Sequence, residues 1–157
     1  MPGPEAILIR KWRAWRRLPA PVRALFVPTW CLLGGARLAT LLLPFRRLAP
    51  HLGKHLGNTA FSPLLAPGQV ARAAQIGQVV ELAARYAPWR ARCHEQAIVA
   101  RVWLGGFKIP YVLYYGVGKG MDGTLQAHAW VCAGPVNVTG GDSWAEFTVV
   151  GAFFGPG

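Results

Sequence analysis

Two residues carry the chemistry that the sequence suggests: Cys93 in "RCHEQAIVARVWLGG" and His128 in "LQAHAWVC". The first stretch predicts a helix that begins near Arg92, which puts Cys93 in its first turn. Free N–H groups and the helix dipole favour negative charge there, so a thiol in such a place forms the nucleophilic thiolate more readily. A cysteine at a helix start that faces a histidine on a strand is an arrangement suited to cysteine hydrolases.

Structural roles compete with this interpretation. A free cysteine is among the most buried residue types, and a single strand histidine is often a core residue. Zinc is a second alternative, but His128 and Cys132 would lie roughly 13 Å apart along one strand. Cys93 and His94 would diverge on their helix. The sequence therefore predicts no metal site, and it shows no motif for a cofactor.

Side chains in the strand "LQAHAWVC" should alternate between two faces. We expect Ala127 and Ala129 to point to the packed face. Gln126, His128 and Trp130 should share the other face, which would line the catalytic cleft. Gln126 and Trp130 are therefore candidate substrate-binding residues, and Trp130 would shield the imidazole from water.

A catalytic histidine needs a group that fixes its tautomer and stabilises the imidazolium ion. Asp142 and Asn137 follow the next turn, and both can accept a hydrogen bond from the imidazole. Asp142 is preferred because a carboxylate stabilises positive charge. Asn137 is the alternative, because we expect it directly opposite His128 on a neighbouring strand.

The elements that must position these residues change along the chain from helical to strand-like patterns. Helices are expected over residues 6–18, 22–43, 69–86 and 92–106, and strands over 109–118, 125–132, 136–141 and the end of 144–154. Helices followed by antiparallel strands indicate an α+β fold. We expect a basic, apolar helical segment at 1–57 and a core at 58–157, packed as one unit.

The chain has 157 residues and a formal net charge of +11, and the N-terminal segment carries most of this charge. Its cluster "RKWRAWRR" pairs cations with tryptophans, a combination suited to an anionic membrane surface or an acidic partner. A solvated face over a core helix is the alternative. No nucleic-acid-binding motif is present, so we expect no specific nucleic-acid partner.

Three cysteines without CxxC spacing suit a reducing compartment, and the N-terminus does not have the pattern of a secretory signal. The apolar stretch 24–45 holds Arg37 and two prolines. Its longest uncharged piece is about 13 residues, shorter than the roughly 17–25 of a spanning helix. We expect a cytoplasmic protein, with a buried helix or one that lies on the membrane surface.

The stretch "RCHEQAIVARVWLGGFKIPYVLYYGVGKG", followed by "LQAHAWV", resembles the transglutaminase-like B proteins of lasso-peptide biosynthesis, the leader peptidases of that pathway. The shared features are a cysteine that opens a helix, a helix ending in glycine, a strand closing in Gly-Val and an Ala-His-Ala-Trp-Val strand. Here these are Cys93, Gly105–Gly106, Gly116–Val117 and Ala127–Val131. The "AHAWV" pentamer alone is common to wider transglutaminase-like proteins.

The resemblance implies a papain-like or transglutaminase-like fold with a Cys–His–Asp triad. It implies cleavage of a ribosomally made precursor peptide between leader and core, before macrolactam ring closure. Its partners would be the leader peptide, a separate leader-recognition protein and an ATP-dependent macrolactam synthetase. It also implies an acid at position 140, where this chain has Gly140.

Two other functions fit the same residues. The chain could be a non-catalytic scaffold of the same fold that binds peptides or a membrane surface. It could also transfer an acyl group to an amine on the same Cys–His centre. The reactivity of the Cys93 thiol would distinguish a scaffold from an enzyme. The molecule that accepts the acyl group, water or an amine, would distinguish a peptidase from an acyl transferase.

Overall fold

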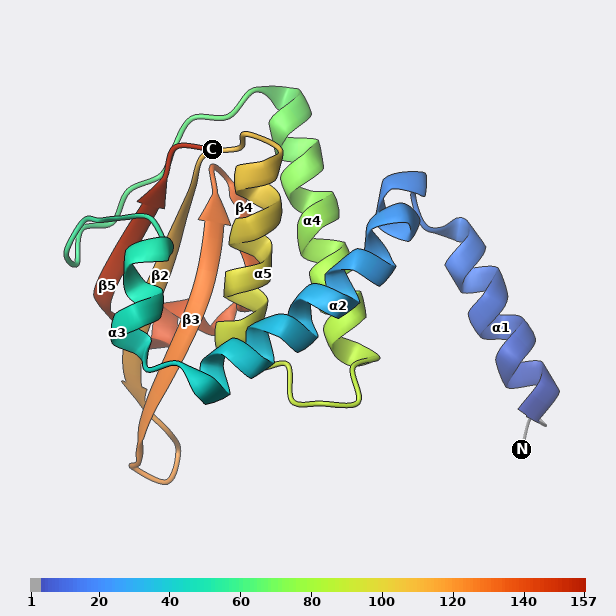
Figure 1. Cartoon of the computed structure of the whole chain (residues 1–157), viewed down its shortest axis with the longest axis horizontal. Coiled ribbons are helices and arrows are strands. Elements are labelled where there is room, and N and C mark those ends of the chain that lie inside the picture. Colours follow the sequence, from blue (N-terminus) through green and yellow to red (C-terminus); the bar gives the residue numbers. More distant parts are fainter. Residues whose placement is uncertain (1–3) are drawn as a thin grey trace.

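The computed structural model describes residues 4–157, with the sheet at one side and α1 extending from the other (Figure 1). The helices are α1 (Pro4–Arg17), α2 (Ala20–Leu42), α3 (Phe45–Leu48), α4 (Pro67–Arg85) and α5 (Cys93–Gly106), with 3-10 turns at Ala49–His51 and Ser143–Glu146. The strands are β1 (Lys54–His55), β2 (Tyr111–Lys119), β3 (Leu125–Ala133), β4 (Val136–Thr139) and β5 (Thr148–Gly155).

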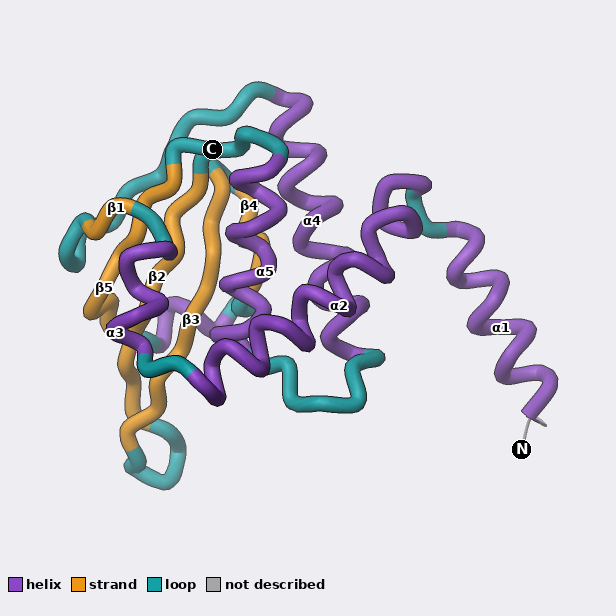
Figure 2. Tube along the Cα trace, viewed as in Figure 1, coloured by secondary structure: helices purple, strands orange, loops and turns teal. Residues whose placement is uncertain are grey.

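The strands form one antiparallel sheet in the order β1-β5-β2-β3-β4, and α4 and α5 cover one of its faces (Figure 2). The α+β prediction is therefore confirmed. The short strand β1 was not predicted: Lys54 and His55 join the sheet only because they pair with Phe154 and Phe153 of β5. Such a short strand has too few residues to produce an alternating pattern.

The main core lies between this helix pair and the sheet. Its largest buried side chains include Ile76, Val80, Leu104, Leu113 and Val131. Helix α4 approaches β4 closely through a glycine, since a Cβ at position 77 would lie 2.6 Å from the carbonyl oxygen of residue 138. This approach holds β4 in place, and Gly140 follows directly after that strand.

Helix α2 packs on α4 and α5 and continues through Pro28 without ending. Its buried residues, Val22, Thr29, Leu33 and Ala36, follow one face, as expected for a helix that covers a core on one side. Trp103 of α5 donates a hydrogen bond of 2.9 Å to the Thr29 hydroxyl. This contact joins the two helices at a buried polar point.

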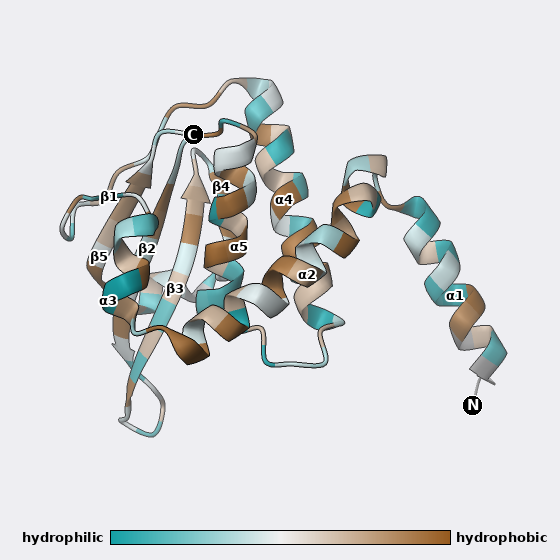
Figure 3. Ribbon diagram, viewed as in Figure 1, coloured by the Kyte–Doolittle hydropathy of each residue, from teal (hydrophilic) through white to brown (hydrophobic). Residues whose placement is uncertain are grey.

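The opposite face of α2 is apolar and exposed (Figure 3). Val27, Leu38, Leu41 and Leu42 are each at least 60% exposed. Among the described residues, α2 is the helix whose length and composition would suffice to cross a membrane, and most of it is not buried in the fold. The packing shows a helix with one partnered face and one bare apolar face.

Candidate active site

Cys93 is the first residue of α5, which confirms the predicted helix start. The Arg92 side chain makes no capping hydrogen bond. Instead the backbone N–H of Arg92 donates to Glu95 Oε2 at 3.0 Å, so a carboxylate in the first turn holds the start of the helix. The thiol therefore lies at the N-terminal, positive end of the α5 dipole.

Glu95 also connects this helix start to α2. Its Oε1 accepts hydrogen bonds from the Arg37 guanidinium at 3.0 Å and from the Thr40 hydroxyl at 3.1 Å. Burial alone would raise the pKa of Glu95. The hydrogen bonds from its own backbone, from Arg37, from Thr40 and from the Arg92 backbone together lower that pKa below its ordinary value. Glu95 is thus a buried carboxylate that one charged side chain and two neutral groups stabilise in its ionised form.

His128 finds its hydrogen-bond partner in the main chain. Its Nε2 lies 2.8 Å from the carbonyl oxygen of Gly140. Because a carbonyl oxygen only accepts, Nε2 carries the proton and the neutral ring keeps the lone pair on Nδ1. The ring lies beside Phe147 and Trp130, with centroids 4.8 and 5.8 Å away. Nδ1 is then the ring nitrogen that is free to accept a proton.

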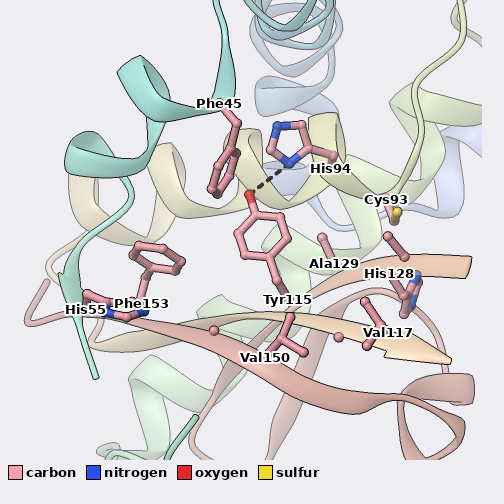
Figure 4. A pocket seen from close by; sticks show the side chains of 13 residues that line it. Phe45, His55, Cys93, His94, Tyr115, Val117, His128, Ala129, Val150 and Phe153 are labelled. Atoms are coloured by element: carbon pink, nitrogen blue, oxygen red, sulfur yellow. Dashed lines mark hydrogen bonds between the residues drawn. The ribbon is translucent and has the colours of Figure 1, made fainter. Parts of the chain in front are cut away.

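Cys93 and His128 line the same open cavity of about 490 Å³ and lie at the same end of it (Figure 4). Within the described residues, the hydrogen bond of the His128 ring is to Gly140 and not to the Cys93 thiol. Catalytic hydrogen bonds are often long or poorly aligned without substrate and tighten when it binds. The structure therefore brings the predicted nucleophile and base to the same end of one cavity, where the imidazole stacks on Trp130 and so lies on the other side of β3 from Cys93.

The predicted third residue is placed differently. Asp142 is exposed and directly precedes the 3-10 turn at Ser143–Glu146. Asn137 pairs with Cys132 and not with His128, so the expectation that it lies opposite His128 is wrong. The tight turn after β3 pairs Ala133 with Val136, which places Asn137 opposite Cys132, four residues along β3 from His128; its amide donates to the Gly141 carbonyl. The catalytic role of Asp142 stays a prediction from the sequence, and the observed contact of His128 favours the Gly140 carbonyl instead.

Gly140 itself has a conformation that suits glycine. Its φ is +100°, and an added Cβ would overlap the Cβ of Trp130. The carbonyl of position 140 thus lies beside the imidazole at the position where the resemblance implied an acidic side chain. In this backbone a side chain at that position would be strained.

The proposed substrate-binding pair does not line the cavity. Trp130 is 3% exposed and packs with Tyr114 on the sheet face away from α5. Gln126 is exposed, and its amide lies near Gly120. Ala127 and Ala129 line the cavity instead. The expected face is wrong because α5 covers the alanine side of β3, and Cys93 stands at the end of that helix.

The sequence analysis missed a polar pair next to the thiol. The Tyr115 hydroxyl and His94 Nδ1 are 2.8 Å apart, and both residues line the cavity (Figure 4). Burial lowers the pKa of His94, although Glu95 acts in the opposite direction. Burial and the nearby Cys93 raise the pKa of Tyr115. Both groups are therefore neutral near pH 7. The sequence did contain a signal for Tyr115: side chains along its strand alternate between the two faces of the sheet, which could have placed Tyr115 on the face that α5 covers.

No group of three or more His, Cys, Asp or Glu side chains in residues 4–157 is placed to hold a metal ion. The remaining thiols lie elsewhere: Cys31 is exposed on α2, and Cys132 lies on the face of β3 away from α5. Burial raises the pKa of Cys132 to about 11. Cys93 is thus the thiol that shares the cavity with His128.

The family model of the transglutaminase-like superfamily matches residues 39–152. The chain belongs to this superfamily. The matched region of this transglutaminase-like protein holds α3, β1, α4, α5, β2, β3, β4 and the first part of β5. The superfamily includes cysteine peptidases. No curated protein and no solved structure matches the chain.

Proposed function

We propose that this transglutaminase-like protein is a cysteine peptidase that removes the leader from a ribosomally made lasso-peptide precursor before macrolactam ring closure. The observation that supports it most is the placement of Cys93, at the start of α5, and His128 at one end of a common cavity. The resemblance of residues 92–131 to the lasso B proteins supports the choice of substrate.

In the proposed reaction His128 Nδ1 takes the thiol proton, and the Cys93 thiolate attacks the scissile carbonyl carbon. The negative oxygen forms near the N-terminus of α5, where the helix dipole favours it. The imidazolium then returns its proton to the leaving amine, the C–N bond breaks, and a thioester remains. Water, deprotonated by His128, hydrolyses the thioester and restores the thiol. The Gly140 carbonyl keeps the ring oriented throughout.

The test is cleavage of a precursor peptide with its recognition protein present, followed by mass spectrometry. Wild-type protein should release a free leader carboxylate, and Cys93→Ala should not. Equal cleavage by both would end the peptidase proposal. A leader amide formed with an added amine, and no free acid, would indicate acyl transfer. An unreactive Cys93 thiol would favour a non-catalytic scaffold.

The partners follow from the same proposal: a leader peptide, a separate leader-recognition protein and an ATP-dependent macrolactam synthetase, all in the cytoplasm. The basic α1 and the bare face of α2 would meet an anionic membrane surface or an acidic partner. Exposed Leu8, Ile9 and Trp12 on α1 support this proposal, as does Arg16, which stacks 4.9 Å from the Trp12 ring. Such surfaces combine apolar contact with charge.

A further inference from the structure

The cavity next to Cys93 extends well beyond the catalytic residues. Its volume of about 490 Å³ falls within the roughly 300–1,000 Å³ of ligand pockets. Phe45, His55 and Phe153 lie at the far end (Figure 4), and Val150 and Gly151 also line the cavity. Catalysis on a peptide bond requires only the end that holds the thiol and the imidazole. The rest of the cavity is therefore available to another part of the substrate.

Aromatic rings from separate elements build this far end. Phe45 of α3 meets Tyr115 of β2 edge to face, with ring centroids 5.2 Å apart. Tyr115 meets Phe153 of β5 in the same way at 5.9 Å, and His55 of β1 lies 5.0 Å from Phe153. Edge-to-face contacts of this kind favour defined ring positions. The wall is therefore a formed aromatic surface.

The lining offers no opposite charge to a charged guest. It contains no Asp, Glu, Lys or Arg among its residues in the described part of the chain. The Tyr115 hydroxyl and His94 Nδ1 bond to each other, and the His55 ring packs on Phe153. A charged side chain placed there would lose its water and gain at most an imidazole as partner, which is costly. An apolar side chain would gain from burial.

We propose that this cavity is a subsite for a bulky apolar side chain, aromatic or large aliphatic, on the peptide residue whose carbonyl Cys93 attacks. The inference deepens the proposed peptidase function and rests on it. The substrate class is then a peptide with such a residue at the cleavage site, and small or charged residues there are rejected.

Two substitutions change the cavity without touching the catalytic pair. Phe45→Ala removes one wall ring, and Phe45 is 46% exposed, so the fold should survive. Phe61→Ala is the matched control, because Phe61 is also 46% exposed but lies in a different hollow. Gly151→Leu fills the cavity: a Cβ there would make ordinary contacts of 3.7 Å with Phe153 and 3.9 Å with His55.

The experiment uses the full chain and three probes, Ac-Ala-Ala-X-chloromethyl ketones with X as Phe, Ala or Asp. The Cys93 thiolate displaces chloride and forms a thioether, which mass spectrometry locates. We expect the Phe probe to label Cys93 at least about tenfold faster than the other two, as apolar pockets discriminate on that scale. Phe45→Ala and Gly151→Leu should reduce this preference, and Phe61→Ala should keep it. Circular dichroism verifies that each variant is folded.

A second arm separates failure of the subsite from failure of the peptidase proposal. Calorimetry measures binding of Ac-Ala-Ala-Phe-Ala-amide and its Asp analogue to Cys93→Ala. Equal labelling by all three probes overturns the subsite but leaves a reactive nucleophile. If none of the three probes labels Cys93 but the Phe peptide binds better than the Asp peptide, the subsite proposal stands and the peptidase proposal is overturned. No preference in either arm overturns the subsite.

Discussion

The imidazole Nε2 of His128 lies 2.8 Å from the main-chain carbonyl oxygen of Gly140. This contact supplies the orientation that an acidic side chain would otherwise give, without adding a full negative charge. It assigns the proton to Nε2 and leaves Nδ1 free to accept one. The described partner of the imidazole is thus the main chain, and the dependence of the proposed Cys93–His128 site on nearby side chains can be measured.

Removal of the two side-chain candidates should affect cleavage little. We expect Asp142→Ala and Asn137→Ala each to keep the rate within about tenfold of wild type. Loss of an orienting carboxylate costs on the order of 10⁴-fold in serine proteases. The measurement is kcat and KM on the precursor peptide. A fall of that size in Asp142→Ala alone would show that its carboxylate reaches His128 during turnover.

Placing the implied acid at position 140 should damage the protein. Gly140→Asp puts a side chain at φ +100° and against Trp130, so we expect a loss of stability of at least about 1–3 kcal/mol from backbone strain alone. Gly141→Asn is the control, because position 141 has φ +65° and open space, which Asn tolerates. Chemical denaturation compares the two. Equal stability of Gly140→Asp and wild type would contradict the described turn.

The three thiols should differ in reactivity. Cys93 should react fastest with iodoacetamide at pH 7, and exposed Cys31 should follow. Cys132 should stay unmodified until the pH approaches its pKa of about 11, because its burial favours the neutral thiol. Peptide mapping after alkylation at a series of pH values measures this order. Alkylation of Cys132 before Cys93 would argue against the nucleophile assignment.

Cys31→Ala and Cys132→Ala should keep most of the cleavage activity.

Glu95 should contribute stability that acid removes. Its pKa is lower in the folded chain than its ordinary 4.5, so its contribution is present above that value and is lost as the pH falls through the folded pKa. Glu95→Gln should lower the free energy of unfolding by roughly 1.5–3 kcal/mol at pH 7 and by less in acid. Glu81→Gln is the control: it removes an exposed pair with Arg85 and should cost less than about 0.5 kcal/mol. Equal losses would show that the buried network adds nothing.

The basic face of α1 should decide binding to anionic surfaces. Reversing Arg13, Arg16 and Arg17 to Glu should weaken binding to phosphatidylserine vesicles at low salt. The control reverses Arg85, Arg90 and Lys119, which are exposed elsewhere and give the same change in net charge. Vesicle sedimentation compares both triples. Equal weakening would show that only the total charge matters, and no change in either would favour a simply solvated helix.

Local patterns in the sequence determined much of this protein. A helix start with a first-turn acid placed Cys93, and an alternating strand with "AHAWV" placed His128. The change from helical to strand periodicity gave the α+β order. These features depend on neighbouring residues in the chain, so the sequence records them directly.

The tertiary structure decided the rest. The partner of His128 is a backbone carbonyl, which has no residue type to reveal it, and a register shift between β3 and β4 sets its place. The face of β3 that meets Cys93 depends on which side α5 covers. The aromatic wall and the Arg37–Glu95 pair join residues far apart in sequence, and Arg37 lies 58 positions from Glu95. Such contacts depend on how separate elements pack, and no local pattern encodes that packing.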